Sequence, residues 1–166
     1  MSVREILTIP HPLLKQVAEP VDDFTPKIQS ILTDLSDTTD SSPGFALAAP
    51  QIGEMIRAIC VDATQAKRET KTPNGKILLV NPEIIETGEA EINREGCLSI
   101  PGYTGDIKRY QYIKLKGITP RGEEKTITSR GWEAVALQHE IDHLDGILFL
   151  DRVVSIKNDL FKRKQN

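Results

Sequence analysis

The feature that most constrains the fold is an apolar stretch with a small polar cluster inside it. Between residues 129 and 145 the apolar side chains cover most of the circumference of a helix, so this helix is expected to be central and buried. Gly146 follows it, where a left-handed residue often ends a helix. The same stretch contains His-Glu-Ile-Asp-His at 139–143. Burying so polar a cluster is costly unless it has a partner or a task.

The polar cluster has the spacing of a metal site. His139 and His143 are four positions apart, so on a helix both imidazoles lie on one face and can reach one ion. Glu140 then stands beside the water that the ion would bind. This His-Glu-x-x-His pattern is typical of hydrolases with a zinc-binding helix. The alternative, a surface helix that happens to carry two histidines, conflicts with the apolar surroundings.

A third ligand has to come from another part of the chain. The remaining histidine, His11, lies between two prolines and is interpreted as structural or solvated. Cys97 is the best candidate, because Gly96 before it permits a sharp turn or a close approach to an ion. One thiolate and two imidazoles leave a fourth position for water, which is typical of a catalytic site. Cys60 lies in an apolar run and is expected to be a core side chain.

Such a site predicts the hydrolysis of an amide. A divalent ion lowers the pKa of bound water from ~15.7 to about 7. Glu140 can then take the water's proton and return it to the leaving nitrogen. The oxyanion that forms needs hydrogen-bond donors, and the candidates are the backbone N–H of Leu98 and the side-chain amide of Gln51.

Strands dominate the first two thirds of the sequence. A first helix is expected to begin at Pro26 with Thr25 as its cap. Polar composition predicts a loop at 37–43 and a long excursion between strands at 64–75. Strands are expected at 56–62, 77–80, 84–86, 107–118 and 125–128, with a hairpin at 120–122 and a short amphipathic helix after Ser155. This order predicts one α+β domain over residues 1–166, in which antiparallel sheets pack around a central metal-binding helix and a short helix lies at the C-terminus.

Composition excludes several classes of protein. The formal net charge is -3 and the pI is about 5.7, and neither value indicates a nucleic-acid-binding surface. No run of 18 or more apolar residues is present, so no membrane span is expected. The first residues do not have the pattern of a secretion signal or an organelle presequence. We therefore expect a cytoplasmic protein without direct nucleic-acid specificity.

Three segments together resemble the peptide deformylase family. The family carries a G-x-G-L-A-A-P-Q strand, an E-G-C-L-S loop and a Q-H-E-x-D-H-L-x-G helix. This chain reads GFALAAPQ at 44–51, EGCLS at 95–99 and QHEIDHLDG at 138–146, in the same order. Segments near both ends are also similar, so the resemblance covers nearly the whole chain.

The resemblance implies removal of the formyl group from the N-terminal formyl-methionine of nascent polypeptides, with release of formate. It implies one divalent metal ion, with iron(II) as the native ion and zinc or another divalent ion able to replace it. The roles that it implies are metal ligation by Cys97, His139 and His143, acid–base catalysis by Glu140, and oxyanion binding by Gln51 and the Leu98 amide.

The resemblance also places Gly44, Phe45 and Ala46 on the strand that pairs with the substrate backbone. Ala46 replaces the family's second glycine of this motif. If that position required a positive φ, alanine would cost roughly 1 kcal/mol. Substrate affinity is therefore the property that this replacement is expected to affect.

A pocket for the methionine side chain is expected on the metal-facing side of the helix. Ala136, Val135 and Trp132 lie three, four and seven positions before His139, so they share its face. The alternative for all three is simple core packing. Two supporting residues are also expected near the site: Glu95, paired with Arg109, and Asp142, with surface ion pairing as the alternative.

Two other functions are compatible with these motifs. One is an endopeptidase that uses the same His-Glu-x-x-His device, and the other is a non-catalytic relative that binds peptides. The basic residues at 162–164 further suggest transient contact with the ribosome through the C-terminal helix, although a cationic helix end has a simpler explanation in the helix dipole.

Overall fold

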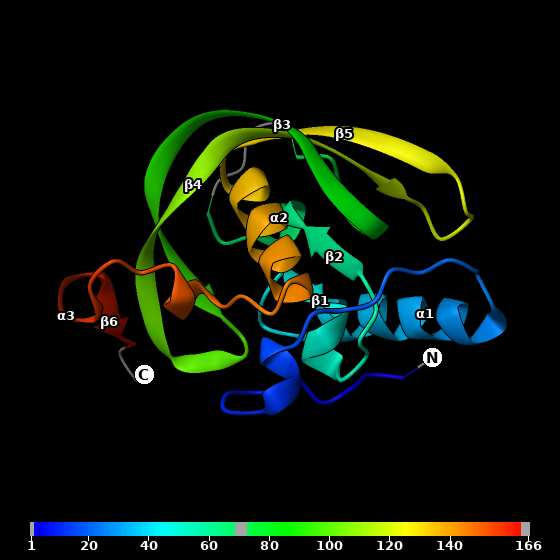
Figure 1. The fold of residues 1–166 in the computed structure, drawn as a ribbon, viewed down its shortest axis with the longest axis horizontal. Coiled ribbons are helices and arrows are strands. Elements are labelled where there is room, and N and C mark those ends of the chain that lie inside the picture. Colours follow the sequence, from blue (N-terminus) through cyan, green and yellow to red (C-terminus); the bar gives the residue numbers. More distant parts are fainter. Residues whose placement is uncertain (1, 69–72, 164–166) are drawn as a thin grey trace.

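The computed structural model describes residues 2–68 and 73–163. Its α-helices are α1 (Pro26–Ser41), α2 (Gly131–Leu144) and α3 (Ile156–Asp159), and its short 3-10 helices are η1 (Pro12–Lys15), η2 (Ala49–Ile52), η3 (Ala63–Gln65) and η4 (Phe149–Asp151). Its strands are β1 (Ala46–Ala48), β2 (Ala58–Asp62), β3 (Lys76–Cys97), β4 (Ile100–Ile118), β5 (Glu124–Arg130) and β6 (Leu160–Lys162) (Figure 1). None of the described helices is long and apolar enough to cross a membrane.

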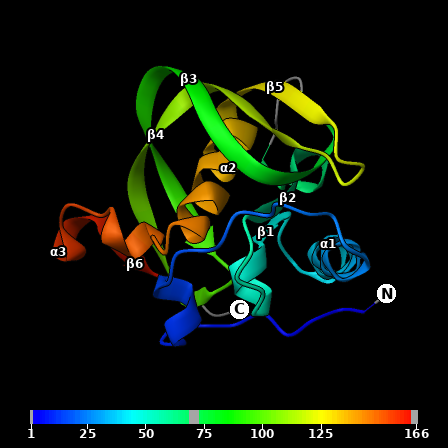
Figure 2. The ribbon, with the colours of Figure 1, turned by 45° about the vertical axis from the view of Figure 1, so that its right-hand side comes forward.

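One curved antiparallel sheet forms the frame of the molecule. The described strands pair in the order β1-β2-β3-β4-β5, and β6 pairs with β4. The pairing of β3 with β4 shifts register between Val80 and Glu83 and again between Ile84 and Glu86. Unpaired residues of this kind bend and twist a strand. As a result β3, β4 and β5 arch over α2, while β1 and β2 lie on its other side (Figures 1 and 2). The expected α+β class with antiparallel pairing is confirmed.

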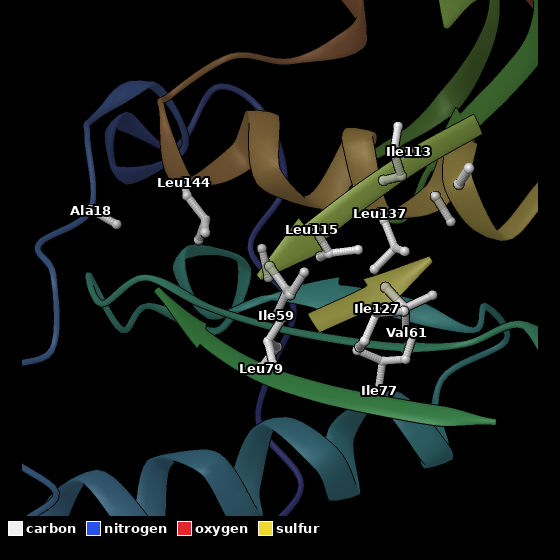
Figure 3. Close-up of a cluster of buried hydrophobic side chains, with 13 residues drawn as sticks. Ala18, Ile59, Val61, Ile77, Leu79, Ile113, Leu115, Ile127, Leu137 and Leu144 are labelled. Atoms are coloured by element: carbon white, nitrogen blue, oxygen red, sulfur yellow. The ribbon is translucent and has the colours of Figure 1, made fainter. Parts of the chain in front are cut away.

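Helix α2 is buried on nearly all sides. Every side chain from 133 to 144 is buried except Ile141, which is half-buried. Leu137 and Leu144 pack in one apolar cluster with side chains of β2, β3, β4 and β5, among them Ile59 and Leu115 (Figure 3). The helix begins two residues later than expected because residues 129 and 130 belong to β5. The expectation of a buried helix is confirmed, and its role in metal binding stays a prediction.

Helix α1 covers the outer side of β1 and β2. The Thr25 side chain accepts a hydrogen bond from the Ile28 N–H at 3.2 Å, and Pro26 is the first helical residue, as expected. Leu32 and Leu35 pack against the first two strands in a second cluster. Cys60 of β2 belongs to the same cluster and is fully buried, and its burial raises its pKa to about 11. Its interpretation as a core side chain is confirmed.

The loop expected at 37–43 is wrong over its first part, because α1 continues to Ser41. Thr38 and Thr39 are buried, and the Thr39 hydroxyl donates to the Leu35 carbonyl at 2.7 Å. Packing against the sheet therefore outweighs the weak helix propensity of threonine and aspartate in this segment. Of the excursion expected at 64–75, residues 69–72 lie outside the described residues, and its start contains η3.

The strands expected at 77–80 and 84–86 are parts of one strand of 22 residues, β3. Its second half is polar and mostly exposed, so it shows no apolar alternation from which a strand could be predicted. It is held by backbone pairing with β4, which begins at Ile100 rather than at 107. The expected hairpin at 120–122 is confirmed as the turn between β4 and β5.

The C-terminal helix is shorter than expected. Only Ile156–Asp159 is helical, and the chain then pairs with β4 as strand β6. The expected amphipathic helix through 162–164 is therefore wrong, and residue 164 lies outside the described residues. Leu160 pairs with Gly105, and its side chain packs against a third apolar cluster that includes Ile107 and Phe149. Leu160 is therefore partly buried by strand pairing rather than by a helix face.

Gly146 ends α2 at φ 70, in the left-handed region that glycine favours. A methyl group there would lie 2.6 Å from the carbonyl oxygen of Lys15. We expect Gly146→Ala to lower the free energy of unfolding by roughly 2 kcal/mol or more, of which about 1 kcal/mol is the left-handed backbone and the rest is the clash. Urea denaturation measures this loss.

The matched control is Gly122→Ala in the β4–β5 turn. Gly122 has φ 84, but a methyl group there would meet no atom within 4 Å. This variant should lose only about 1 kcal/mol. Equal losses in the two variants would show that contact with Lys15 contributes nothing.

Candidate active site

Cys97, His139 and His143 meet in the interior of the protein. The two histidines lie one turn apart on α2, with ring centroids 5.0 Å apart. Cys97 is the last residue of β3, where a tight turn through Leu98 leads into β4. Its Sγ lies 3.4 Å from His143 Nε2, and one donor atom from each of the three residues lies within 4.8 Å of the others. All three side chains are buried.

These three residues fit a metal ion. A thiolate sulfur and an imidazole nitrogen bound to one tetrahedral ion lie roughly 3.6 Å apart, given bond lengths of about 2.3 and 2.1 Å. The distance between Cys97 and His143 is close to that value. Glu140 lies beside the group, and its Oε2 is buried without a hydrogen-bond partner among the described residues. A buried carboxylate oxygen of this kind needs a polar ligand, so the site has the composition of a possible metal centre.

Burial and charge set the protonation of these side chains. Burial raises the pKa of Glu140 to about 7, against the opposing charge of His139. Burial also lowers the pKa of His143 well below its usual value, with further lowering by His139 and Arg109. Burial likewise lowers the pKa of His139, but the charge of Cys97 and hydrogen bonds to Cys97 and Glu95 outweigh it, so the net shift is well upward.

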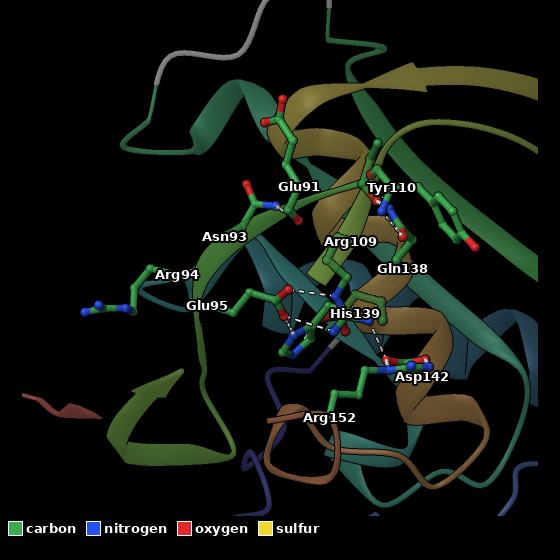
Figure 4. A network of polar contacts seen from close by, with 12 residues as sticks. Glu91, Asn93, Arg94, Glu95, Arg109, Tyr110, Gln138, His139, Asp142 and Arg152 are labelled. Atoms are coloured by element: carbon green, nitrogen blue, oxygen red, sulfur yellow. Dashed lines mark hydrogen bonds and ion pairs between the residues drawn. The ribbon is translucent and has the colours of Figure 1, made fainter. Parts of the chain in front are cut away.

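A buried ion network orients His139 (Figure 4). Its Nδ1 lies 2.8 Å from a carboxylate oxygen of Glu95, so its Nε2 is the nitrogen free to face Cys97. Arg109 of β4 donates two hydrogen bonds to Glu95, at 2.7 and 3.0 Å, and one to Asp142 of α2 at 2.6 Å. Arg152 adds two more to Asp142. The network thus joins β3, β4 and α2 at the candidate metal centre.

The expected pair of Glu95 and Arg109 is confirmed, but the alternative of a surface ion pair is wrong. Glu95 is 2% exposed and Arg109 4%. Burial opposes both charges, yet the pKa of Glu95 is lowered because hydrogen bonds from His139 and Arg109 outweigh that effect. The link from Arg109 to Asp142 was not predicted. The alternation of side chains along a strand could have indicated that Arg109 is buried. Arg109 lies two positions after the buried Ile107 and therefore shares its face.

Gln51 approaches the same centre from η2. Its side-chain oxygen accepts from the Ala48 N–H at 2.9 Å, and its Nε2 donates to the Ser99 hydroxyl at 3.0 Å and lies 3.7 Å from Cys97 Sγ. The amide orientation is therefore fixed by its neighbours. Ser99 was not predicted as a partner, although it follows Cys97 in the same motif.

The N-terminal segment holds these two parts together. The Leu7 N–H donates to the Gln51 carbonyl, and the Ile9 N–H donates to the Ser99 carbonyl, at 2.8 and 3.0 Å. His11, two residues further, caps η1 by accepting from Leu13 N–H with its Nδ1. Its interpretation as a structural residue is confirmed.

A cavity of about 470 Å³ opens above the candidate centre. Cys97, His139 and Glu140 are among the residues that line it. Its walls include all six of the expected substrate-binding residues: Gly44, Phe45, Ala46, Trp132, Val135 and Ala136. The ring centroids of Phe45 and Trp132 lie 6.4 Å apart, and the two ring planes are tilted by 49°. The sequence did not predict four further lining residues that come from distant segments: Gln65, Lys67, Arg68 and Arg163.

Ala46 is accommodated without backbone strain. It lies in β1, paired with Val61 of β2. Among the described non-glycine residues only Asn81 has a positive φ. The cost considered for alanine at this position therefore does not arise, and its methyl group simply forms part of the cavity wall.

The family model for polypeptide deformylase matches residues 3–159. The chain belongs to this family. Among curated deformylases, that of Carboxydothermus hydrogenoformans is 43% identical over 156 residues, which is 94% of this chain and 97% of the relative. That of Heliobacterium modesticaldum is 44% identical over 153 residues, which is 92% and 95% of the two chains.

Solved deformylase structures have the same fold. The crystal structure from Legionella pneumophila has a TM-score of 0.85 at 36% identity and covers 94% of this chain and 89% of that one. The structure from Thermotoga maritima has a TM-score of 0.83 at 33% identity and covers 93% and 100%. This deformylase is therefore a metal-dependent hydrolase that removes the formyl group from the N-terminal formyl-methionine of nascent polypeptides. The endopeptidase and non-catalytic alternatives are not supported.

In this deformylase the buried network predicts a large stability effect at Arg109. Arg109→Leu leaves the carboxylates of Glu95 and Asp142 buried without their shared cation. Asp142 keeps Arg152, but buried Glu95 keeps only its contact with His139. We expect a loss of about 3 kcal/mol in the free energy of unfolding, measured by urea denaturation, because a poorly compensated buried charge is strongly destabilising.

The control is Lys76→Leu, which removes the lysine from a 2.7 Å ion pair with Asp40 whose side chains are 32% and 54% exposed. Solvent screens this pair, so its loss should cost less than about 1 kcal/mol. A similarly small loss in the free energy of unfolding in both variants would contradict a large stabilising contribution from the buried network.

Proposed function

We propose that Cys97, His139 and His143 hold the divalent ion of this deformylase and that Glu140 is its acid–base group. The observation that supports this is the convergence of three buried donor atoms within 4.8 Å of one another, next to a cavity that Cys97 and His139 line. Glu140 lies next to them with a buried, unpartnered oxygen. One soft thiolate and two imidazoles suit zinc or iron, and they leave a coordination position for the reaction.

The ion, when bound, supplies Lewis acidity that activates water and polarises the formyl carbonyl. Glu140 takes a proton from the attacking water and delivers it to the amide nitrogen as the C–N bond of the formyl group breaks. Formate and the free amino terminus are the products. Glu95 holds His139 with its Nε2 toward the centre, and Arg109 holds Glu95.

Gln51 and Leu98 stabilise the oxyanion in this proposal. The Gln51 amide points its NH2 group toward Cys97 and is held there by the Ala48 N–H and the Ser99 hydroxyl. Leu98 directly follows Cys97 in the tight turn, so its N–H is the nearest backbone donor along the chain. Donors that are fixed before the reaction stabilise a developing charge without reorganisation.

The substrate lies along β1 and inserts its methionine side chain between β1 and α2. Among the described strands only β2 pairs with β1, so Gly44, Phe45 and Ala46 can pair with an extended peptide on the other edge. Trp132, Val135 and Ala136 supply the apolar wall toward α2. The thioether chain of methionine is flexible and polarisable, which suits an apolar pocket of this kind.

Iron(II) is the native ion in this proposal, and zinc or another divalent ion also occupies the site. Zinc binds such donors more tightly than iron, so availability decides which ion is present. Neither Cys60 nor Cys97 forms a disulfide, which suits the reducing cytoplasm. Contact with the ribosome stays a prediction. The helix that was expected to make this contact covers only Ile156–Asp159, and strand β6 follows it.

The decisive experiment is formate release from formyl-Met-Ala-Ala amide by anaerobically purified protein, with elemental analysis of the same samples. Glu140→Gln should lose at least about 100-fold in kcat while it retains its metal, because acid–base catalysis contributes 10²–10⁴-fold. Cys97→Ala should lose the metal as well as the activity.

His11→Asn is the matched control, since it removes a histidine that lies outside the cavity. It should keep both metal and activity. Full activity of Glu140→Gln, or full metal content in Cys97→Ala, would refute the assignment of these roles.

The pocket assignment predicts the effect of a larger side chain at Val135. Val135→Phe fills space on the α2 wall, so it should raise the KM for formyl-methionyl peptides by about tenfold or more. Formyl-alanyl peptides, whose side chain does not reach the wall, should be affected less. Steady-state kinetics with both peptides gives the comparison.

The control for bulk is Val17→Phe, at a position that is 65% exposed and outside the cavity. Its kinetics should match those of the unaltered protein. If Val135→Phe also leaves the KM for formyl-methionyl peptides unchanged, Val135 does not belong to the pocket.

A further inference from the structure

The C-terminal strand places a cation at the mouth of the cavity. Strand β6 pairs with β4 through three residue pairs, and the Arg163 N–H then donates to the Gly102 carbonyl at 2.9 Å. The ring of Phe161 in β6 is covered by the guanidinium of Arg94, 3.5 Å from the ring centroid. Backbone pairing and this stacking together fix the position from which the Arg163 side chain projects.

The Arg163 guanidinium lies against the backbone of Gly96, next to Cys97. A methyl group on Gly96 would overlap the Arg163 guanidinium, which shows how closely the two approach. Arg163 lines the cavity and is exposed. Within residues 2–68 and 73–163, no carboxylate forms an ion pair with it. Its charge is therefore free to meet a ligand.

A second guanidinium stands at another wall of the cavity. Arg68 lies over the ring of Trp132 at 4.1 Å and donates to the Arg94 carbonyl at 3.1 Å. Further along the chain, Asn74 is bonded to the start of α2. Its backbone and side-chain N–H groups donate hydrogen bonds to the buried Glu133. Arg68 is therefore held at the cavity by contacts with both α2 and β3.

The exposed charged side chains that line the cavity, within the described part of the chain, are all positive. Among the described residues that line it, Lys67, Arg68 and Arg163 are exposed cations, and the only acids are the buried Glu95 and Glu140. Exposed cations without exposed acids raise the local concentration of negatively charged groups. The entrance is thus polarised although the whole chain carries a formal net charge of -3.

We propose that Arg163 gives this deformylase a preference for a carboxylate in the first residues after formyl-methionine. The inference rests on the proposed function, which places the formyl group at Cys97. An extended peptide advances ~3.3 Å per residue. A guanidinium beside Gly96 can therefore reach the side chain of the second or third residue. Arginine binds carboxylates through two parallel hydrogen bonds, which favours glutamate or aspartate over their amides.

The expected preference is modest. Exposed ion pairs contribute 0.2–1 kcal/mol, which corresponds to about 1.4- to 5-fold in kcat/KM. Salt screens such interactions, so the preference should decrease as ionic strength rises. A purely structural role of Arg163 in supporting the cysteine turn would change activity toward all peptides equally. The charge dependence of the substrate therefore separates the two roles.

The test compares formyl-Met peptides with amidated C-termini that carry Glu, Gln or Lys at the second or the third residue. The readout is kcat/KM for formate release. The unaltered protein should prefer Glu to Lys by about 1.4-fold or more at one of the two positions. Arg163→Gln should abolish the preference, and Arg163→Glu should reverse it. The same peptides as free acids distinguish a terminal carboxylate from a side-chain carboxylate.

The matched control is Arg121→Glu, which changes the net charge by the same amount as Arg163→Glu. Arg121 is exposed in the β4–β5 turn and lies outside the cavity. It should keep the preference for Glu. A ratio of Glu to Lys rates that is the same in the unaltered protein and in Arg163→Glu would overturn the proposal while formate release remains intact. Failure of every peptide to release formate would overturn the proposed function along with it.

Discussion

A buried arginine between two carboxylates holds the interior of this protein together. Arg109 lies on β4 and binds Glu95 of β3 and Asp142 of α2 at the same time. Each of these groups would be costly to bury alone, because a charge removed from water needs a partner of opposite sign. Once they are joined, the apolar helix can carry His139 and Glu140 in its middle. The rest of the fold is arranged so that these strands and this helix meet at one place.

The curvature of the sheet brings the strand ends to the helix. The register shifts in β3 let one long strand pair with β2 at its start and follow β4 over α2 to its end. Strand β3 therefore runs over α2 from one side of the helix to the other (Figure 1). Its last residue, Cys97, lies next to His143. The N-terminal segment then bonds to the backbone of Gln51 and Ser99, which fixes the remaining wall.

Short sequence patterns were sufficient to predict those parts of the structure that depend on interactions between neighbouring residues. Thr25 and Pro26 predicted the start of α1, and Gly146 predicted the end of α2. The spacing of His139 and His143 predicted a shared face, and helical periodicity predicted that Val135 and Trp132 line the same cavity. In each case the relevant interactions lie within a few residues of one another.

Features that depend on distant backbone pairing were not predictable in this way. The polar half of β3 is a strand only because β4 lies beside it, and β6 is a strand only because β4 has an edge at Tyr103. The link between Arg109 and Asp142 and the approach of Arg163 to Gly96 likewise join segments that no local pattern relates.

The attachment of β6 to β4 also affects how the protein is handled. Arg163, the last described residue, lines the cavity, whereas Ser2 at the other end of the described chain bonds to Asp34 on α1. A purification tag or a surface-immobilisation linker attached close to Arg163 would begin beside the incoming peptide. Fusions at the N-terminus keep that entrance clear, and they are the appropriate format for kinetic work.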